Sequence, residues 1–188
     1  EDHVAGLAAI PDADVHVHWR DQPALRSIDD LVASYGLRTS AQPAMRQLLL
    51  EEFGFQNRPD ALPFDDGDRL DVGGSVITAI HLPGHTPGHC GFLIEPEGVM
   101  VLGDIDLTGF GPYYADEGSD LAAMETSLAR CREIDAAWYV TFHHKGVVEG
   151  RDAFLTALDR YRGAIGRRDD ELLARLDRPR SLDELVAE

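Results

Sequence analysis

The fold of this chain is decided by one stretch near its middle, residues 66–89, which reads DGDRLDVGGSVITAIHLPGHTPGH. Residues 76–81 predict a β-strand, and a tight Pro-Gly turn follows that strand. Three of the eight histidines fall within nine residues here: His81, His85 and His89. Backbone geometry rather than packing fixes the direction of a ring in such a turn. The stretch therefore favours a ligand site built on a strand end.

Two further strand ends carry polar side chains of the same kinds. A strand predicted over 99–102 is followed by Gly103-Asp104, and one predicted over 138–142 is followed by His143-His144. Taken singly, a histidine at a strand end is more often a surface residue, and a Gly-Asp pair is usually a turn. Together, imidazole and carboxylate donors at three strand ends are what a metal site at a sheet edge requires.

The remaining pattern predicts an α/β domain. Strands are also expected at 13–18 and 90–94, with a turn at 95–98 and a loop over 54–69. Helices are expected at 23–35, at 40–53 with Ser40 as the cap, and at 120–134 with Ser119 or Asp120 as the cap. A further helix is expected from residue 151 onward, with Phe154, Leu155, Leu158 and Tyr161 buried. A capping box at Ser181 predicts one more helix after it.

Composition narrows the class of protein. The 188 residues, 44% of them apolar, fit one globular domain, and no apolar run is long enough to cross a membrane. The formal charge of −17, with Lys145 as the only lysine, repels phosphate backbones and argues against a nucleic-acid groove. Cys90 and Cys131 form no CxxC motif and are expected to be reduced, buried thiols of a cytoplasmic protein.

The order of these residues resembles the metallo-β-lactamase superfamily over nearly the whole chain. The stretch 66–89 is similar to the third motif of that family, and Gly103-Asp104 is similar to its metal-bridging carboxylate. Residues Glu1-Asp2-His3 resemble the end of the signature His-x-His-x-Asp-His. The resemblance implies a four-layer αββα sandwich, with its first strands and the His-x-His pair expected before residue 1. It also implies a catalytic domain over 1–150 and a helical extension over 151–188, packed on that domain.

The resemblance also implies a dinuclear metal site, with zinc expected and iron or manganese as alternatives. The implied ligands of one metal are Asp2, His3, and either His143 or His144, of which His143 is favoured. His85 and the His-x-His pair expected before residue 1 are the implied ligands of the other metal, and Asp104 bridges the two. Residues 1–188 alone are therefore not expected to hold the full dinuclear site. His89 is expected to support the site from behind, and Asp106 ranks below Asp104. His16 and His18 are instead interpreted as one exposed face of a strand.

The function implied by the resemblance is hydrolysis of a small ester, thioester or lactone by a metal-bound hydroxide. Asp2 would orient the nucleophile, and Tyr113 or Tyr114 would donate a hydrogen bond to the oxyanion, unless that pair serves ordinary aromatic packing. Two alternatives stay open, a phosphodiesterase or ribonuclease of the same fold and a non-catalytic remnant that acts as an interaction domain. The expected partner is a small-molecule substrate, and a homodimer is left open.

Overall fold

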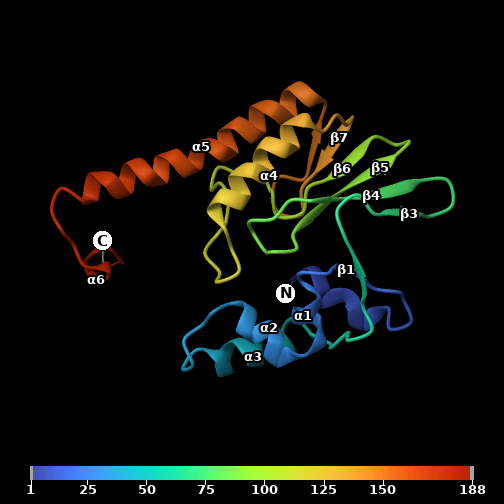
Figure 1. Cartoon of the computed structure of the whole chain (residues 1–188), viewed down its shortest axis with the longest axis horizontal. Helices are drawn as coiled ribbons and strands as arrows, with labels where there is room; N and C mark the ends of the chain where they lie inside the picture. Colours follow the sequence, from blue (N-terminus) through green and yellow to red (C-terminus); the bar gives the residue numbers. More distant parts are fainter. Residues whose placement is uncertain (1, 187–188) are drawn as a thin grey trace.

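The computed structural model describes residues 2–186, and a six-stranded sheet forms its centre (Figure 1). The strands lie in chain order, and every neighbouring pair is antiparallel except β6 with β7. Their bounds are β3 Arg69–Asp71, β4 Val76–His81, β5 Cys90–Glu95, β6 Val99–Val101, β7 Trp138–Val140 and β8 Val147–Glu149. The parallel β6–β7 pair matters most for the site, because both strands end at the same edge.

Two helices cover one face of this sheet, α4 (Leu121–Glu133) and α5 (Arg151–Arg175) (Figure 1). Asp120 caps α4 as predicted, since its carboxylate accepts a hydrogen bond from the Ala123 N–H at 2.9 Å. The apolar side chains between sheet and helices form the main core, which includes Leu82, Met100, Leu102, Leu128, Tyr139, Phe154, Leu158 and Tyr161.

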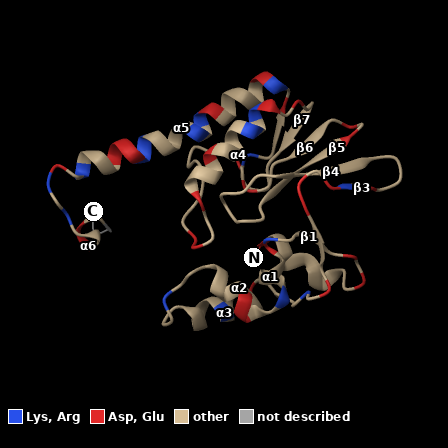
Figure 2. Ribbon diagram, in the orientation of Figure 1, with Lys and Arg blue, Asp and Glu red and all other residues tan. Residues whose placement is uncertain are grey.

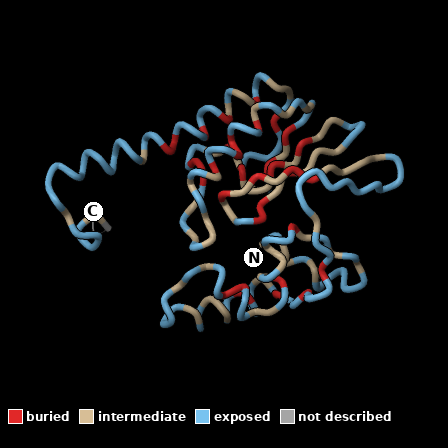
Figure 3. Tube along the Cα trace, viewed as in Figure 1, coloured by how far each residue is buried: buried red, intermediate tan, exposed pale blue. Residues whose placement is uncertain are grey.

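The segment before the sheet folds as a smaller unit with its own core (Figure 3). It contains η1 (Asp2–Ala9), β1 (His16–His18), α1 (Gln22–Arg26), α2 (Ile28–Ser34), α3 (Gln42–Glu51) and β2 (Leu62–Phe64), with β1 parallel to β2. The mixed α/β class with a C-terminal helix is confirmed. Of the four expected layers, the described residues supply the α4–α5 layer and one large sheet, and only the two-stranded β1–β2 sheet stands in for the second β-layer.

Several predicted element bounds were wrong for local reasons. The helix expected at 23–35 is two helices, because Ser27 is extended and its hydroxyl caps α2 by accepting from the Asp30 N–H. Ser40 caps nothing, since α3 begins at Gln42 with Pro43 in its first turn. The first strand covers only 16–18, the predicted loop 54–69 contains β2 and the start of β3, and β8 was not predicted.

His18 corrects the expectation of an exposed histidine face. His18 is only 2% exposed, and its ring stacks on the ring of His81 with the two centroids 4.1 Å apart. His18 Nε2 lies 3.4 Å from an Asp65 carboxylate oxygen. His16 is exposed as predicted. The β1 strand is therefore joined to the end of β4 by a buried pair of rings.

This burial predicts a pH-dependent stability. Burial, and then the neighbouring His81, lower the pKa of His18 against the opposing charges of Asp65 and Asp21. A lowered pKa means that the folded state favours the neutral ring. The stabilisation is therefore complete above about pH 6.5, the usual pKa of histidine, and is lost as the pH falls below that value.

The free energy of unfolding, measured in urea at pH 7.5 and 5.5, should fall less on acidification in His18→Phe than in the wild type. The same substitution at the exposed His16 is the control, and equal losses in all three proteins would contradict the prediction.

The last segment begins on the core and leaves it. Helix α5 is buried at intervals through Ile165, and its outer turns are exposed, with Leu173 at 66% (Figure 3). Helix α6 (Leu182–Val186) opens with the predicted capping box, in which Ser181 and Glu184 exchange hydrogen bonds between side chain and backbone. The division into 1–150 and 151–188 stays a prediction, and residues 1, 187 and 188 lie outside the described residues.

The two cysteines are free thiols. Cys131 is buried as predicted, whereas Cys90 is only half-buried. Burial raises the pKa of each thiol to about 12. No helix within residues 2–186 is both long and apolar enough to span a membrane.

Candidate metal centre

The predicted ligands come from four separate parts of the chain that meet at one edge of the large sheet. Asp104 follows β6, His143 follows β7, and His85 lies in the turn between β4 and β5. Asp2 and His3 open η1, which lies against this edge, and His3 contacts Asp104 across 101 positions of sequence. The short parallel β6–β7 pair explains why Asp104 and His143 are neighbours.

The carboxylate of Asp104 is the centre of the cluster. His143 Nε2 lies 2.9 Å from Oδ1, His3 Nε2 lies 3.1 Å from each oxygen, and His85 Nε2 lies 3.5 Å from Oδ2. The Asp104 side chain is only 14% exposed. All three rings therefore present the same nitrogen, Nε2, to one largely buried carboxylate.

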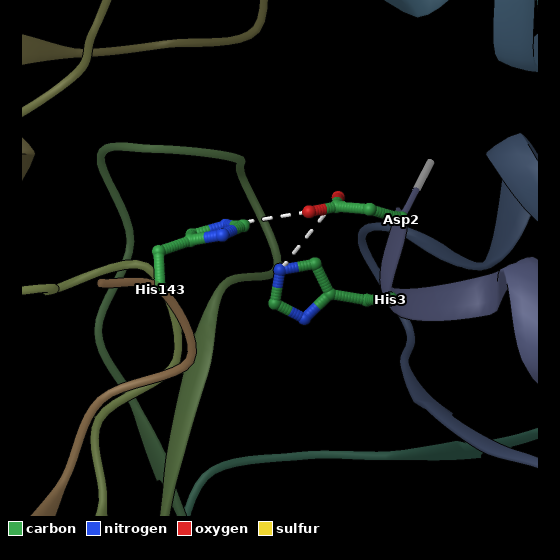
Figure 4. Close-up of side chains that lie close together, drawn as sticks. All are labelled: Asp2, His3 and His143. Carbon is green, nitrogen blue, oxygen red and sulfur yellow. Dashed lines mark ion pairs between the residues drawn. The ribbon is translucent and has the colours of Figure 1, made fainter. Parts of the chain in front are cut away.

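Asp2 adds a second carboxylate beside two of these rings (Figure 4). Its Oδ2 lies 3.3 Å from His143 Nε2, and its Oδ1 lies 3.9 Å from His3 Nε2. One donor atom from each of Asp2, His3 and His143 lies within 4.8 Å of the others. Two carboxylates and three imidazoles with converging donors form an oxygen and nitrogen set that fits a divalent metal such as zinc, iron or manganese.

The charges of the cluster support one another. Burial alone raises the pKa of Asp104, but the hydrogen bond and charge of His3, followed by the charges of His85 and His89, outweigh it and hold that pKa well below its usual range. Burial likewise opposes the charged form of His3, and the hydrogen bond and charge of Asp104, with the charge of Asp2, raise its pKa. The site thus keeps Asp104 ionised and ready to bind a cation.

Two hydrogen bonds to the backbone of Asp104 hold this residue in place. Its N–H donates to His89 Nε2 at 3.0 Å, and the Tyr161 hydroxyl donates to its carbonyl at 3.1 Å. His89 Nδ1 in turn lies 2.8 Å from the Leu82 carbonyl, which requires the proton on Nδ1 and leaves Nε2 as the acceptor. His89 thus occupies the supporting position expected of it. Tyr161 was predicted as a buried residue of the long helix, but its hydrogen bond to Asp104 was not predicted.

His85 is oriented by the loop that follows Asp104. Its Nδ1 lies 3.3 Å from the Tyr113 carbonyl, so a proton on Nδ1 would turn Nε2 toward Asp104. The Ser119 hydroxyl donates to the His85 carbonyl at 2.8 Å. A backbone carbonyl that receives the far N–H of a histidine is the common way to fix a metal-binding ring.

The less favoured candidates lie away from the central carboxylate. His144 has a φ of 27°, and its ring centroid lies 6.0 Å from that of His143. The Asp106 carboxylate accepts from the Thr108 N–H and hydroxyl, which turns it into its own loop. Tyr114 packs against the main core, whereas the Tyr113 ring lies 5.7 Å from that of His85 and its hydroxyl donates to Asp116. The aromatic-packing interpretation therefore describes Tyr114, and Tyr113 forms a wall beside the site.

Two contacts of the site were not visible in the sequence. Phe142 stacks on the His3 ring with centroids 3.8 Å apart. Arg168 of α5 donates to the carbonyls of Phe110 and Pro112 and lies over the rings of Phe110 and Tyr114. Arg168 is 56 positions from Pro112, and no local pattern links the two.

The Arg168 contacts predict a role in fixing His85. Replacing Arg168 by Met should free the loop that carries the Tyr113 carbonyl, and the affinity for metal should fall about tenfold, the lower end of the effect of losing such outer contacts. Competition with a chromophoric chelator measures this affinity. Arg167→Met is the matched control, since Arg167 is the exposed neighbour on the same helix. Equal affinities in the two variants would show that Arg168 does not position the site.

Comparisons with known proteins point to one family. The family model of the metallo-beta-lactamase superfamily matches residues 1–144. A 34% identity over 87 residues links the chain to an atrochrysone carboxyl ACP thioesterase of Emericella nidulans, and a 31% identity over 103 residues links it to one of Claviceps purpurea. These matches cover 44% and 52% of this chain but only 28% and 33% of the relatives, so the matched segment spans about a third or less of their length.

Solved structures show the same fold. A metallo-beta-lactamase family protein from Thermus thermophilus superposes with a TM-score of 0.66 at 23% identity, over 95% of this chain and 61% of that one. A protein solved in a di-iron-bound form superposes with a TM-score of 0.57 at 24% identity, over 86% of this chain and 69% of that one. With the family model matching 144 of the 188 residues, the chain belongs to the metallo-β-lactamase superfamily.

Proposed function

We propose that the protein is a metal-dependent hydrolase that cleaves small acyl thioesters, within the wider class of esters and lactones. The observation that carries the proposal is the convergence of three imidazole Nε2 atoms on the buried Asp104 carboxylate, with Asp2 beside them. The choice of thioesters is supported by the curated relatives, two of which are named as ACP thioesterases. A small-molecule substrate suits the charge of −17 better than a nucleic acid does.

The residues that would hold metal fall into two groups joined by Asp104. Asp2, His3 and His143 form one group, and His85 lies on the Oδ2 side of Asp104. Two ions are proposed, with zinc expected and iron or manganese as alternatives. Such ions lower the pKa of bound water to about 7 and polarise a carbonyl oxygen.

The other steps are assigned to the side chains of this chain. The Asp2 carboxylate, whose side chain is 37% exposed, orients the attacking water and accepts its proton. Water adds to the thioester carbonyl, the C–S bond breaks, and the proton passes to the departing thiol, so that acid and thiol are the two products. The Tyr113 ring lines the approach to His85. Its hydroxyl is proposed as a donor to the oxyanion, reached by giving up its hydrogen bond to Asp116.

The test combines metal content with a substrate panel. The protein loaded with zinc, iron or manganese should retain metal, as measured by elemental mass spectrometry, and should release thiol from acyl thioesters. Lactones should be cleaved more slowly, and bis(p-nitrophenyl) phosphate should not be cleaved. Cleavage of the phosphodiester instead would favour the phosphodiesterase alternative. Absence of both metal and turnover would leave the interaction-domain alternative.

A matched pair of variants sharpens this test. His143 and His144 are adjacent, but only His143 lies within 4.8 Å of the Asp2 and His3 donors in the described cluster. His143→Ala should lose metal and activity, whereas His144→Ala should retain both. The reverse result would assign the ligand to His144 and would overturn the geometry proposed for this half of the site.

A further inference from the structure

A shallow, open pocket lies on the smaller unit, beside the loop that carries His85. Its volume is about 570 Å³. It is lined by Trp19, Arg20, Gln22, Pro23, Arg26, Pro63 and Pro87. Pro87 is two residues after His85, so one wall of this pocket belongs to the same β4–β5 turn as His85.

Asp21, which lies between the pocket residues Arg20 and Gln22 in the sequence, links this part of the smaller unit to the loop that carries His85. The Asp21 carboxylate accepts from the Thr86 hydroxyl at 2.5 Å and from the Gly88 N–H at 2.7 Å. Both oxygens of the Asp21 carboxylate are therefore hydrogen-bonded to this loop. A ligand in the pocket would lie at a fixed position relative to His85.

The pocket is cationic in a strongly acidic chain, in which acidic residues occur in the smaller unit and in the helices α4 and α5 (Figure 2). Arg20 and Arg26 make no ion pair with any residue in the range 2–186. The Arg20 guanidinium lies 5.0 Å over the half-exposed ring of Trp19, and Arg26 reaches only the Gln22 amide at 3.5 Å. Guanidinium groups bind phosphate oxygens, and an indole face with three prolines offers apolar contacts to an arm attached to the phosphate.

We propose that this pocket binds the phosphate and adjoining arm of a 4′-phosphopantetheine thioester while the acyl carbonyl lies at Asp104. This inference rests on the proposed function, since only a thioester substrate has such a carrier. The same arm is present in coenzyme A and in carrier proteins, and the recognition is of the phosphate common to both. Long polyanions are still disfavoured by the net charge, because the cationic patch contains only two arginines.

The first experiment compares butyryl-pantetheine with its 4′-phosphate. In the wild type the phosphate should lower KM about tenfold, the effect of one or two charge-assisted hydrogen bonds, with kcat unchanged. In Arg20→Gln/Arg26→Gln the two substrates should have equal KM. Arg38→Gln, at an exposed arginine outside the pocket, should behave as the wild type. Equal KM values for the two substrates in the wild type would overturn the proposal.

A binding measurement separates this inference from the hydrolase itself. Free 4′-phosphopantetheine should change the tryptophan fluorescence of the wild type, and Trp19→Phe and the double arginine variant should lose this change. If binding is seen and no thioester is cleaved, the pocket stands and the proposed function fails. If thioesters are cleaved without regard to the phosphate, the hydrolase stands and the pocket assignment fails.

A third comparison determines whether the phosphopantetheine arm that the pocket binds belongs to coenzyme A or to a carrier protein. Butyryl-coenzyme A and a butyryl-carrier protein are assayed with the same variants. A dependence on Arg20 and Arg26 with both substrates supports recognition of the shared arm. Dependence with one substrate alone assigns the pocket to that source, and dependence with neither overturns the proposal.

Discussion

Asp104→Asn should remove most bound metal and lower thioester hydrolysis about 10³-fold, which corresponds to about 4 kcal/mol of lost stabilisation. The substitution keeps the shape of the side chain but removes the charge that three Nε2 atoms surround. The fold should survive, because the hydrogen bonds to His89 and from Tyr161 use only the Asp104 backbone. Metal content, thiol release and melting of the metal-free protein are the three measurements.

Asp106→Asn is the control for this prediction. Its carboxylate lies two residues further along and accepts from the N–H and hydroxyl of Thr108. This variant should keep both metal and activity. If Asp104→Asn binds as much metal as the wild type, or if the two variants behave alike, Asp104 is not the centre of the site.

Gly84→Ala should destabilise the fold by about 4 kcal/mol. Gly84 has a φ of +133°, and an added Cβ would lie 2.4 Å from the backbone N and Cα of Met124 in α4. Strained backbone and overpacking each cost about 1–3 kcal/mol, and here neither neighbour is a flexible side chain that can move aside. Relief would require His85, the next residue, or helix α4 to shift. Urea unfolding of the metal-free protein gives the stability.

The control separates the clash from the backbone penalty. Gly74 has a similar φ, +123°, but an added Cβ would meet nothing within 4 Å. Gly74→Ala should therefore lose only about 1–3 kcal/mol, the cost of the strained backbone alone. Equal losses at the two sites would show that the α4 contact is not rigid.

The sequence predicted those parts of the molecule whose causes are local. The capping residue Asp120, the Ser181 capping box and the strand 76–81 depend on neighbours a few positions away, and all three are present. The candidate ligands were found because each strand end carries its donor in a turn whose residue types are distinctive. The favoured residue of the pair at 143 and 144 is the one that the structure brings to Asp104.

What the sequence did not show depends on contacts between distant segments. His18 is buried because β1 lies against the end of β4, and no pattern in residues 13–18 indicates a stacking partner at His81. The strand β8 is only three residues long, too short to display an alternation of its own. Arg168 lies in the second half of the 25-residue helix α5 and donates to the loop of Phe110 and Pro112, which is more than 50 positions earlier in the sequence.

The distance in sequence between His3 and Asp104 has a thermodynamic consequence. An ion held jointly by η1 and the sheet would act as a removable cross-link, since it binds only while both segments are docked. At a hundred times its dissociation constant, such a ligand adds about 2.7 kcal/mol to the free energy of unfolding. Chelation should therefore speed amide hydrogen exchange first in residues 2–9, while the strands beneath Asp104 keep their protection. The metal would then stabilise the docking of η1 on the sheet in addition to its part in hydrolysis. Loss of the ion would allow the amino-terminal segment to unfold locally before any other part of the protein.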